Sequence, residues 1–485
     1  MPWTGAGGRN GGSRVADNEI TVASALRILH AIHDFLPRHH AGSEIYALEL
    51  GRAQSARHHV TVLCADYDPG RRHGHVTWRV HAGLPVVELV NNWVCGSFAD
   101  TYRSRRIGDQ IAHVLGAVQP DVIHLHNLLN LSFELPSIAR AHGIPVVATL
   151  HDYTLVCPSG GQRIHRAERH VCHVIDTARC ARCFRESPFF AQMSLGTIGA
   201  VTRASRLMHG VAVGISRRVP VLAARLARAA GRVRVMSVTE RDIDERMASA
   251  RAVFDQIDLF VAPSGSIASE FQRLGVDRSK IRVSDYGFVP LRRAGRNGRV
   301  GRLRIGYVGT LVWHKGVHLL VDAVRRLPAD RYEVKIFGNP DVFPDYAADL
   351  RAQAAGLPIR FMGAFGREQT AAVYGQMDVL VVPSLWLENS PLVIHEAFMA
   401  GVPVVGARMG GIADLIRHGE NGFLYDAPSA SALETALRDL IDHPDRLAEF
   451  GRRLPRVKSI AVDADEWDAA YAEVLGRSIP VGAIE

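Results

Sequence analysis

Two blocks of the chain alternate short apolar, β-branched runs with helix-like stretches, and this alternation limits the fold more than any other feature. In the first block the runs are RILHAIH, HVTVLCA, VIHLHN, IPVVATLH, LFVAPS and IRVSDYG. In the second block they are LRIGYVG, YEVKIFG, IRFMG, VLVVPS, VPVVGA and GFLYD. Such alternation is typical of βαβ units, in which helices cover a parallel sheet. The sequence therefore predicts two doubly wound α/β domains.

The domain boundaries are predicted from where this alternation stops. Residues 1–24 are rich in Gly and polar residues, and we expect a disordered leader there. An N-terminal Rossmann-like domain is predicted over residues 25–289, followed by a Gly- and Arg-rich linker over 290–302. The second domain is predicted over 303–445, and a helical segment over 446–485 is expected to pack back on the first domain. Two such domains place a cleft between the carboxyl ends of their sheets, where open α/β sheets bind ligands.

Composition and charge exclude several classes of function. The chain has 485 residues, of which 47% are hydrophobic, so it can bury large cores. Its net charge of +8 is modest for this length, and no nucleic-acid partner is expected. The longest uncharged run, residues 187–202, has 16 residues, fewer than the ~18 to 20 of a membrane-spanning helix. The first residues lack the apolar core of a secretory signal, so we expect a cytoplasmic protein.

The densest chemical signal is a pair of glutamates separated by seven residues, Glu388 and Glu396. The Ser390–Pro391 step between them predicts a helix N-terminus, because proline is tolerated in the first helical turn. The backbone N–H groups of Leu392 and Val393 would then face an anion such as phosphate. Glu396, about two turns along, could accept hydrogen bonds from vicinal hydroxyls such as those of ribose. A solvated glutamate pair on a helix surface is the alternative interpretation.

This region resembles the retaining glycosyltransferases of family 4, which have the two-domain GT-B fold. The glutamate pair, the GVPVV strand, the Gly410–Gly411 turn and ENGFLY carry the resemblance. Further matching segments follow in the family's order: AGSEIYALELG (41–51), VVATLHDY (146–153), FVAPSGSIASEF (260–271), VGTLVWHKG (308–316), FMG (361–363) and DVLVVPS (378–384). The resemblance covers residues 26 to about 445 and implies an acceptor-side first domain and a nucleotide-sugar-binding second domain.

The resemblance also implies roles for individual donor-site residues. Glu396 matches the glutamate that binds the nucleotide ribose, and Glu388 matches the glutamate at the sugar end of the donor. Lys315 matches the lysine that meets the donor pyrophosphate, a suitable role for a compact cation. The family commonly has an arginine after the glycine that is Gly309 here, and this chain has Thr310 instead. Lys315 and backbone dipoles would therefore have to balance the negative charge of the donor phosphates.

Three further positions complete the predicted site. Gly42 matches the loop that passes close to the donor phosphates, where a side chain would obstruct the approach; a plain turn glycine is the alternative. Gly363 ends the FMG segment and is expected on the donor side. His151 follows the strand VVATL, and the resemblance places a histidine here near the transferred sugar; a purely structural histidine is the alternative. Asp152 is expected to cap the following loop.

The implied chemistry is retaining transfer of a hexose from a nucleotide-diphosphate sugar on the donor's front face. The leaving phosphate helps to deprotonate the acceptor, so the scheme needs stabilised leaving-group charge and exclusion of water. It requires no protein nucleophile and no divalent metal or other cofactor. The expected acceptor is a saccharide or lipid-linked glycan of cell-envelope or exopolysaccharide synthesis. A non-catalytic sugar-nucleotide sensor and a GT-B sugar-nucleotide epimerase are the alternative functions.

A cysteine-rich insertion follows the HDYTLV segment over residues 157–183. Its pattern C-x14-C-x7-C-x2-C is formed by Cys157, Cys172, Cys180 and Cys183, with His170 and His173 as further candidate ligands. Four such residues can close a tetrahedral structural zinc site. Reduced thiols and disulfides or redox switching are the alternatives, because the first spacing is long for a zinc ribbon. Some family 4 members with a similar segment carry comparable cysteines.

A basic segment over residues 187–239 interrupts the first block. It contains eight arginines and no Asp, Glu or Lys. Between residues 203 and 234 it also has no Phe, Trp or Tyr on which a nucleic-acid base could stack. The segment predicts either a peripheral contact with an anionic membrane, which would bring the enzyme to a lipid-linked acceptor, or a solvated basic helix face.

Overall fold

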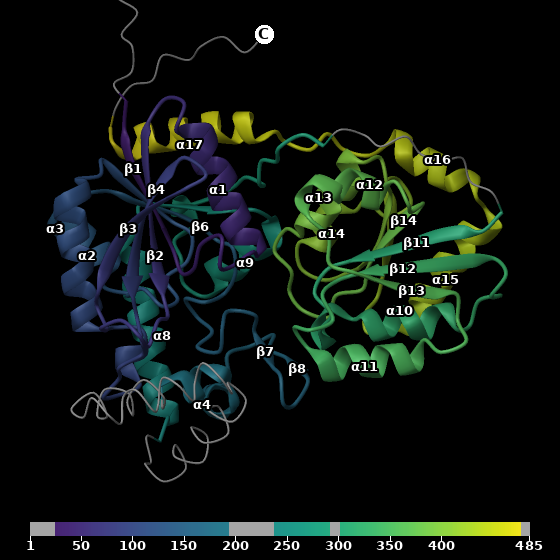
Figure 1. The fold of residues 1–485 in the computed structure, drawn as a ribbon, viewed down its shortest axis with the longest axis horizontal. Coiled ribbons are helices and arrows are strands. Elements are labelled where there is room, and N and C mark those ends of the chain that lie inside the picture. Colours follow the sequence, from purple (N-terminus) through teal and green to yellow (C-terminus); the bar gives the residue numbers. More distant parts are fainter. Residues whose placement is uncertain (1–24, 194–236, 292–300, 477–485) are drawn as a thin grey trace, which may run out of the picture.

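The computed structural model describes residues 25–193, 237–291 and 301–476 of the chain (Figure 1). The predicted leader, most of the basic segment and most of the predicted linker lie outside these residues. The described part contains two α/β units, each built around its own sheet, and the expected pair of parallel-sheet domains is confirmed. Every apolar run named above contains a strand.

The N-terminal sheet has eight strands in the order β10-β9-β6-β5-β1-β2-β4-β3. Its strands are β1 (Arg27–Ile32), β2 (His59–Asp66), β3 (Val76–His81), β4 (Leu84–Val90), β5 (Val122–Leu125), β6 (Val146–Thr149), β9 (Leu259–Ala262) and β10 (Ile281–Val283). Its helices are α1 (Gly42–Gln54), α2 (Arg105–Val118), α3 (Leu135–Ala141), α8 (Glu240–Gln256) and α9 (Gly265–Arg273), with single turns η1 (Ala99–Thr101) and η2 (Arg278–Lys280). The core includes residues from α2, α3, α8 and α9 on one face of the sheet and from α1 on the other.

One edge of this sheet departs from the parallel arrangement that the sequence predicts. Strand β3 runs antiparallel to β4, whereas every other pairing in the sheet is parallel. The two strands are joined by Ala82 and Gly83, both at positive φ (49° and 88°). Two such residues form the tight turn that suits a β-hairpin. A hairpin therefore replaces a βαβ unit here, because no helix intervenes.

The C-terminal sheet is parallel throughout, with six strands in the order β13-β12-β11-β14-β15-β16. Its strands are β11 (Leu303–Val308), β12 (Tyr332–Phe337), β13 (Ile359–Gly363), β14 (Val379–Val382), β15 (Val404–Ala407) and β16 (Gly422–Tyr425). Its helices are α10 (Val317–Val324), α11 (Pro344–Gln353), α12 (Thr370–Tyr374), α13 (Leu392–Met399), α14 (Ile412–Leu415), α15 (Ala430–Asp442) and α16 (Asp445–Arg452), with turns η3 (Trp313–Lys315) and η4 (Arg367–Gln369). They divide between the two faces of the sheet.

Two further segments, helix α17 and the cysteine-rich insertion, lie outside the two sheets. Helix α17 (Ile460–Val474) belongs to the C-terminal end of the chain but packs on α1 in the N-terminal domain (Figure 1). Its Asp463 accepts a hydrogen bond from Tyr46 at 2.8 Å, and its Trp467 donates to the same hydroxyl at 2.9 Å. The cysteine-rich insertion forms a small antiparallel pair, β7 (Ile164–His165) and β8 (His170–Val171), followed by α4 (Thr177–Glu186).

Candidate active site

Loops from the carboxyl ends of both sheets meet between the domains. The Asn389 side-chain amide donates a hydrogen bond to the carbonyl of His151, and the Ser390 hydroxyl donates to Asp285 at 2.7 Å. His395 contacts the same aspartate: its Nε2 atom lies 3.2 Å from an Asp285 carboxylate oxygen. The segment between Glu388 and Glu396 is therefore anchored directly to the N-terminal domain.

Lys315 and Glu388 form an ion pair at the centre of this loop region. The lysine Nζ lies 2.6 Å from Glu388 Oε1, and the Ser384 hydroxyl donates to the same oxygen at 2.8 Å. Glu388 is only 5% exposed, whereas the lysine side chain is 28% exposed. The lysine also lies over the Trp386 ring, 5.3 Å from its centroid. The carboxylate is thus held in place, and its cation remains partly exposed to solvent.

The Gly410–Gly411 turn packs against the backbone of this glutamate. The Gly411 N–H donates to the Glu388 carbonyl at 2.7 Å. A Cβ atom at Gly411 would lie 1.4 Å from the carbonyl oxygen of Asn389, so no other residue fits without displacing the loop. The two glycines allow the close backbone approach that fixes Glu388.

Two buried polar atoms beside Glu388 have no hydrogen-bond partner among the described residues. They are Nε1 of Trp386 and Oδ1 of Asn389, in side chains 8% and 5% exposed. Buried polar groups are nearly always hydrogen-bonded in native proteins, and exceptions call for a bound ligand or water. One donor and one acceptor are therefore available next to the Lys315–Glu388 pair.

The first turns of α1 and α13, from different domains, lie next to each other. Helix α13 begins after Pro391, as the sequence predicts, so the N–H groups of Leu392 and Val393 have no acceptor within the helix. Helix α1 begins at Gly42, where a Cβ atom would lie 3.2 Å from the Leu392 Cδ1 atom. Two helix N-termini at one place favour a bound anion.

Glu396 lies farther along α13. The Tyr374 hydroxyl donates to its Oε2 atom at 2.8 Å. Burial raises the pKa of the Glu396 carboxyl group. The hydrogen bond from Tyr374 thus fixes the orientation of the half-buried Glu396 carboxylate.

Three predicted donor-site residues lie at the carboxyl ends of strands in the C-terminal sheet. Gly309 and Thr310 follow β11, and Gly363 is the last residue of β13. The Gly309 N–H donates to the Phe337 carbonyl, and the Tyr307 hydroxyl donates to the Thr310 carbonyl at 2.9 Å. Gly363 has a positive φ of 77° at the end of β13. The exposed Thr310 side chain brings no charge to this edge.

His151 has hydrogen bonds at both of its ring nitrogens. Its Nδ1 lies 2.9 Å from the Tyr286 hydroxyl, and its Nε2 lies 3.0 Å from Nδ1 of His126. Burial lowers the pKa of His151 to about 3. The half-buried ring is therefore neutral at physiological pH, and it makes no proton available without breaking one of these bonds.

This histidine begins a buried chain of hydrogen bonds that sequence reasoning missed. Nε2 of His126 lies 2.8 Å from Nδ1 of His30, and Nε2 of His30 lies 2.8 Å from the Gln54 side-chain oxygen. Because that oxygen can only accept, Nε2 of His30 carries the proton and its Nδ1 accepts. His126 and then His151 must follow the same rule, so Tyr286 donates to His151. Every hydrogen bond in this series is therefore donated in the same direction, from Tyr286 toward Gln54. Histidines inside three predicted apolar runs were the available sequence signal.

The chain continues toward α17. The Gln54 amide donates to the Tyr471 hydroxyl at 3.1 Å, which lies 2.8 Å from Nδ1 of His124, and Nε2 of His124 lies 2.7 Å from the Thr149 hydroxyl. Burial lowers the pKa of His30 to about 4 and that of His124 and His126 well below the ordinary value. Although the ring atoms of His30, His124 and His126 lie within 4.8 Å of one another, all six nitrogens are already hydrogen-bonded. This cluster therefore fits a hydrogen-bond network better than a metal site.

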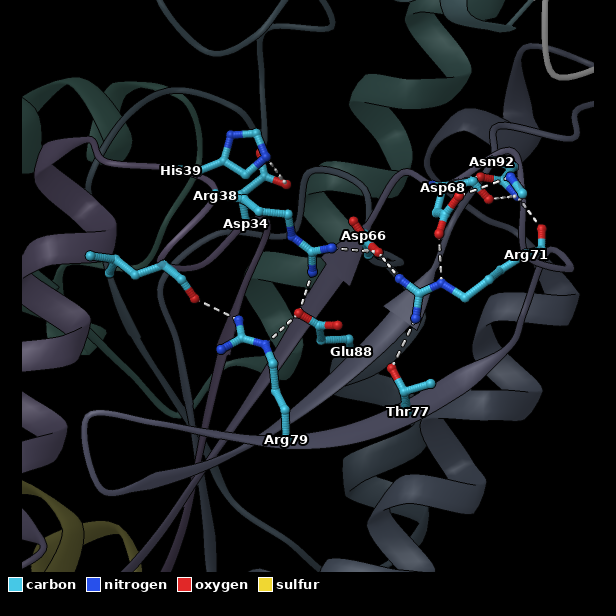
Figure 2. A network of polar contacts seen from close by, with 12 residues as sticks. Asp34, Arg38, His39, Asp66, Asp68, Arg71, Thr77, Arg79, Glu88 and Asn92 are labelled. Atoms are coloured by element: carbon cyan, nitrogen blue, oxygen red, sulfur yellow. Dashed lines mark hydrogen bonds and ion pairs between the residues drawn. The ribbon is translucent and has the colours of Figure 1, made fainter. Parts of the chain in front are cut away.

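A polar network fixes the loop that precedes Gly42 (Figure 2). Arg38 bonds to Asp66 at 2.9 Å and to Glu88, which also pairs with Arg79. Arg71 joins the network through Asp66. The arginines are thus largely neutralised by carboxylates, and the network ties the loop after β1 to β2 and β4.

The β7–β8 hairpin reaches the C-terminal domain beside Lys315. The Arg166 guanidinium lies 5.9 Å from the Phe343 ring centroid. A cavity of about 370 Å³ lies between the two, lined among others by Arg166, Arg169, Trp313, His314, Phe343 and Tyr346. The insertion therefore forms one wall of a cavity whose other wall includes the two residues before Lys315.

The described part of the chain contains no helix that is both long enough and apolar enough to cross a membrane.

Comparison with known proteins gives two domain matches and a fold. Residues 40–191 match the model for Glycosyltransferase Family 4, and residues 293–456 match the model for glycosyl transferases group 1. Similar proteins include sulfoquinovosyl transferase SQD2 of Arabidopsis thaliana, 28% identical over 45% of this chain and 43% of that protein. Another is D-rhamnosyltransferase WbpZ of Pseudomonas aeruginosa, 30% identical over 40% of this chain and 53% of that protein. The chain spans about half the length of the curated relatives it matches.

Solved structures match over nearly the whole chain. Sucrose-phosphate synthase from Thermosynechococcus elongatus superposes with a TM-score of 0.60 at 16% identity, over 93% of this chain and 99% of that one. Anabaena Alr3699/HepE in complex with UDP and glucose superposes with a TM-score of 0.56 at 15% identity, over 92% and 99%. The chain thus has a GT-B fold, in which a region that matches the Glycosyltransferase Family 4 model is followed by a region that matches the glycosyl transferases group 1 model.

Proposed function

We propose that the protein is a retaining glycosyltransferase that transfers a sugar from a nucleotide-diphosphate donor to a saccharide or lipid-linked glycan acceptor. The observation that carries the proposal is the Lys315–Glu388 ion pair beside the adjoining first turns of α1 and α13. A cation and two helix N-termini suit a diphosphate, and a fixed carboxylate suits the sugar next to it. The Alr3699/HepE complexes with UDP and with UDP-glucose support a donor of this class on the same fold.

The donor residues divide by the part of the donor that each would contact. Glu396, oriented by Tyr374, accepts hydrogen bonds from the ribose hydroxyls. Lys315 and the N–H groups of Leu392 and Val393 bind the diphosphate, and Gly42 leaves room for it on the opposite side. Glu388 lies at the sugar end, where the unpartnered Trp386 Nε1 and Asn389 Oδ1 atoms supply a donor and an acceptor for sugar hydroxyls. Ser390 and Pro391 set the start of the helix, and Gly309, Thr310 and Gly363 border the donor at the sheet edge.

Transfer then proceeds on one face of the sugar. The bond between C1 and the phosphate oxygen breaks, a new bond forms between C1 and the acceptor oxygen on the same face, and the acceptor proton passes to the leaving phosphate. Lys315 and the helix N-termini stabilise the negative charge that grows on the leaving group. Glu388 stabilises the positive charge that grows on the sugar. No protein nucleophile is needed.

His151 is placed near the transferred sugar, where it acts by position. Both of its ring nitrogens are hydrogen-bonded and its pKa is low, which argues against proton transfer at this ring. Its carbonyl accepts from Asn389, the neighbour of Glu388. His151 thereby sets the distance between the first domain and the sugar end of the donor.

Nucleotide binding tests the donor site directly. We would measure binding of UDP, GDP, ADP and their sugar conjugates by calorimetry and thermal shift, using the wild type, Glu396→Ala and the exposed control Glu420→Ala. A ligand at a hundredfold excess over its Kd should stabilise the native state by about 2.7 kcal/mol. We expect one nucleotide to bind and Glu396→Ala to weaken it about 10- to 100-fold, the loss of one or two charged hydrogen bonds. Failure of every nucleotide to bind would overturn the proposal.

Stereochemistry and acceptor class need separate measurements. Slow hydrolysis of the bound sugar nucleotide, followed by NMR of the first sugar released, should give the donor's anomeric configuration if transfer is retaining. Binding without hydrolysis or transfer would favour a sugar-nucleotide sensor. Flotation with liposomes of anionic lipid at low salt tests whether the basic segment brings the protein to a membrane, and its failure would favour a saccharide acceptor away from lipid.

A further inference from the structure

The cysteine-rich insertion folds around a single cavity lined by all four of its cysteines. Cys157 follows the buried Val156, Cys172 follows β8, and Cys180 and Cys183 lie one turn apart on α4. The same cavity is also lined by Pro158, Ser159, Arg163 and Arg179. Residues 26 positions apart in the chain are thus gathered at one place by the fold.

The four sulphurs are available as ligands. All six cysteines of the sequence lie in the described residues, and none of them forms a disulfide. A coordinating thiol loses its proton to become a thiolate, so a dication that enters among four free thiols can bind all four sulphurs.

The nearby histidines are less suitable ligands. His170 accepts a hydrogen bond from Arg179 at 3.0 Å, and His173 is exposed. Neither is among the residues that line the cavity. The donor set is therefore four sulphurs, which favours a soft tetrahedral ion.

The regular secondary structure at the start of the insertion is short. Strands β7 and β8 have two residues each, and the middle of the segment is the cavity itself. Small units without a sufficient apolar core are usually held by disulfides or by a metal. Helix α4 is held by Ala181 and Phe184, which are buried in the core of the N-terminal domain, so the two-residue strands are the part of the insertion that an ion would stabilise.

We propose that Cys157, Cys172, Cys180 and Cys183 bind one zinc ion, and that this ion fixes the β7–β8 hairpin against the C-terminal domain. Each thiol gives up one proton, so four protons are released and the site carries a charge of −2. Arg163 and Arg179 line the same cavity, and they are also paired with Glu270 and Glu168. No three of the four sulphurs lie within 4.8 Å of one another in the described structure. Binding therefore requires the cysteine side chains to rotate toward the centre of the cavity, until each Zn–S distance is about 2.3 Å.

An ion at the cysteines would also affect the turn of the β7–β8 hairpin, which faces the C-terminal domain. The strand pair joins Cys172 to Arg166 and Arg169, which line the cavity beside Trp313 and His314. An ion at the cysteines would fix the position of these arginines relative to Lys315. The inference concerns the resting fold and does not depend on the proposed reaction.

The first test is metal content. Full-length protein purified without chelator from zinc-supplemented cells should contain about one zinc per chain by plasma mass spectrometry. The Cys180→Ser/Cys183→Ser variant should lose the zinc, whereas Cys64→Ala/Cys95→Ala, which changes the two cysteines outside the insertion, should keep it. Thiol titration of the native protein should find four protected sulphurs that become reactive when a strong chelator is added.

The second test keeps the proposal falsifiable if the double variant fails to fold. Wild-type protein stripped of metal should be cleaved by trypsin after Arg166 or Arg169 at least several-fold faster than before, as identified by fragment masses, and zinc should restore protection. Four thiols that titrate freely in metal-free protein, with no zinc uptake on addition, would overturn the proposal. So would four sulphurs that become reactive only after reduction, or stoichiometric iron with inorganic sulfide.

Discussion

The Nζ atom of Lys315 lies 2.6 Å from Oε1 of Glu388, and the carboxylate is far more deeply buried than the ammonium. The two residues come from loops 73 positions apart in the sequence, after different strands of one sheet. A buried carboxylate depends on its cation for stability, whereas a partly exposed cation can be hydrated without its carboxylate. The pair is therefore asymmetric, and this asymmetry can be measured.

Changing Lys315→Met should destabilise the protein more than changing Glu388→Gln. Removing one partner of a fully buried pair costs about 3–5 kcal/mol, and the exposure of the lysine reduces the expected loss to about 1–3 kcal/mol. The double variant should recover part of that loss, because no charge is left unpaired. Urea denaturation measures the free energy of unfolding. Arg241→Met, which breaks an exposed pair with Glu245 on α8, is the control; equal losses in Lys315→Met and Arg241→Met would contradict the prediction.

Glu388→Gln should lower the transfer rate much more than donor affinity. The charge that Glu388 stabilises exists on the sugar only near the transition state, so its loss should reduce kcat on the order of 10²-fold. The donor Kd should change by less than about fivefold, because the amide keeps the size and one acceptor of the carboxylate. Steady-state kinetics and calorimetry together separate the two effects. A large change in Kd with unchanged kcat would assign Glu388 to ground-state binding instead.

Acid should destabilise the protein well before its carboxylates are protonated. His30, His124, His126 and His151 have pKa values lowered by burial, so the unfolded chain binds protons near pH 6.5 while the native state does not. Stability is present above about pH 6.5 and is lost as the pH falls toward about 4, by up to ~1.4 kcal/mol per pH unit for each histidine. Urea midpoints between about pH 7.5 and 5.5 measure the slope.

A histidine variant assigns this slope to the buried chain. His126→Gln should reduce the pH dependence by about one proton, although it also lowers stability at neutral pH. His443→Gln changes an exposed histidine at the end of α15 and should leave the slope unchanged. A wild-type curve that is flat between these pH values would be inconsistent with four neutral buried rings.

Gly42→Ala should weaken donor binding without destabilising the fold. Position 42 is in a helix, where Ala is favoured over Gly, and the new Cβ meets only the flexible end of Leu392 at 3.2 Å. Unfolding stability should therefore stay within about 1 kcal/mol of the wild type, while the methyl group enters the space proposed for the diphosphate. Gly116→Ala on α2, with nothing within 4 Å, is the matched control. Unchanged nucleotide affinity in Gly42→Ala would identify Gly42 as a plain turn residue.

Added divalent cations should not be needed for transfer. Lys315 and two helix N-termini supply the positive potential that Mg²⁺ supplies in other phosphate sites. Protein of known zinc content should transfer sugar at rates within about twofold with and without Mg²⁺ or Mn²⁺, since the proposed structural ion is not at the phosphates. A rate that rises steeply with either cation would move part of the phosphate charge onto a metal.

Local sequence patterns determined the two sheets and the start of the helix between Glu388 and Glu396. A parallel strand buried on both faces reads as a short apolar run, and a proline is tolerated at the start of a helix but not in its interior, so both features follow from a few adjacent residues. The resemblance to family 4 then placed Lys315 and Gly42 in the same donor site as the glutamates. In the structure Lys315 is ion-paired with Glu388, and Gly42 packs next to Leu392. Their roles toward a donor remain proposals.

Tertiary structure alone decided the rest. The hydrogen-bond chain from Tyr286 through His151, His126 and His30 to Gln54 joins side chains from distant segments, and only the strand order β6-β5-β1 brings the rings into contact. The antiparallel β3 depended on the backbone of Ala82, a residue that carries no turn signal in the sequence. Periodicity reports which face of an element is buried, because burial repeats with the backbone. It does not report which buried polar groups will meet, because that is set by packing between elements remote in the chain.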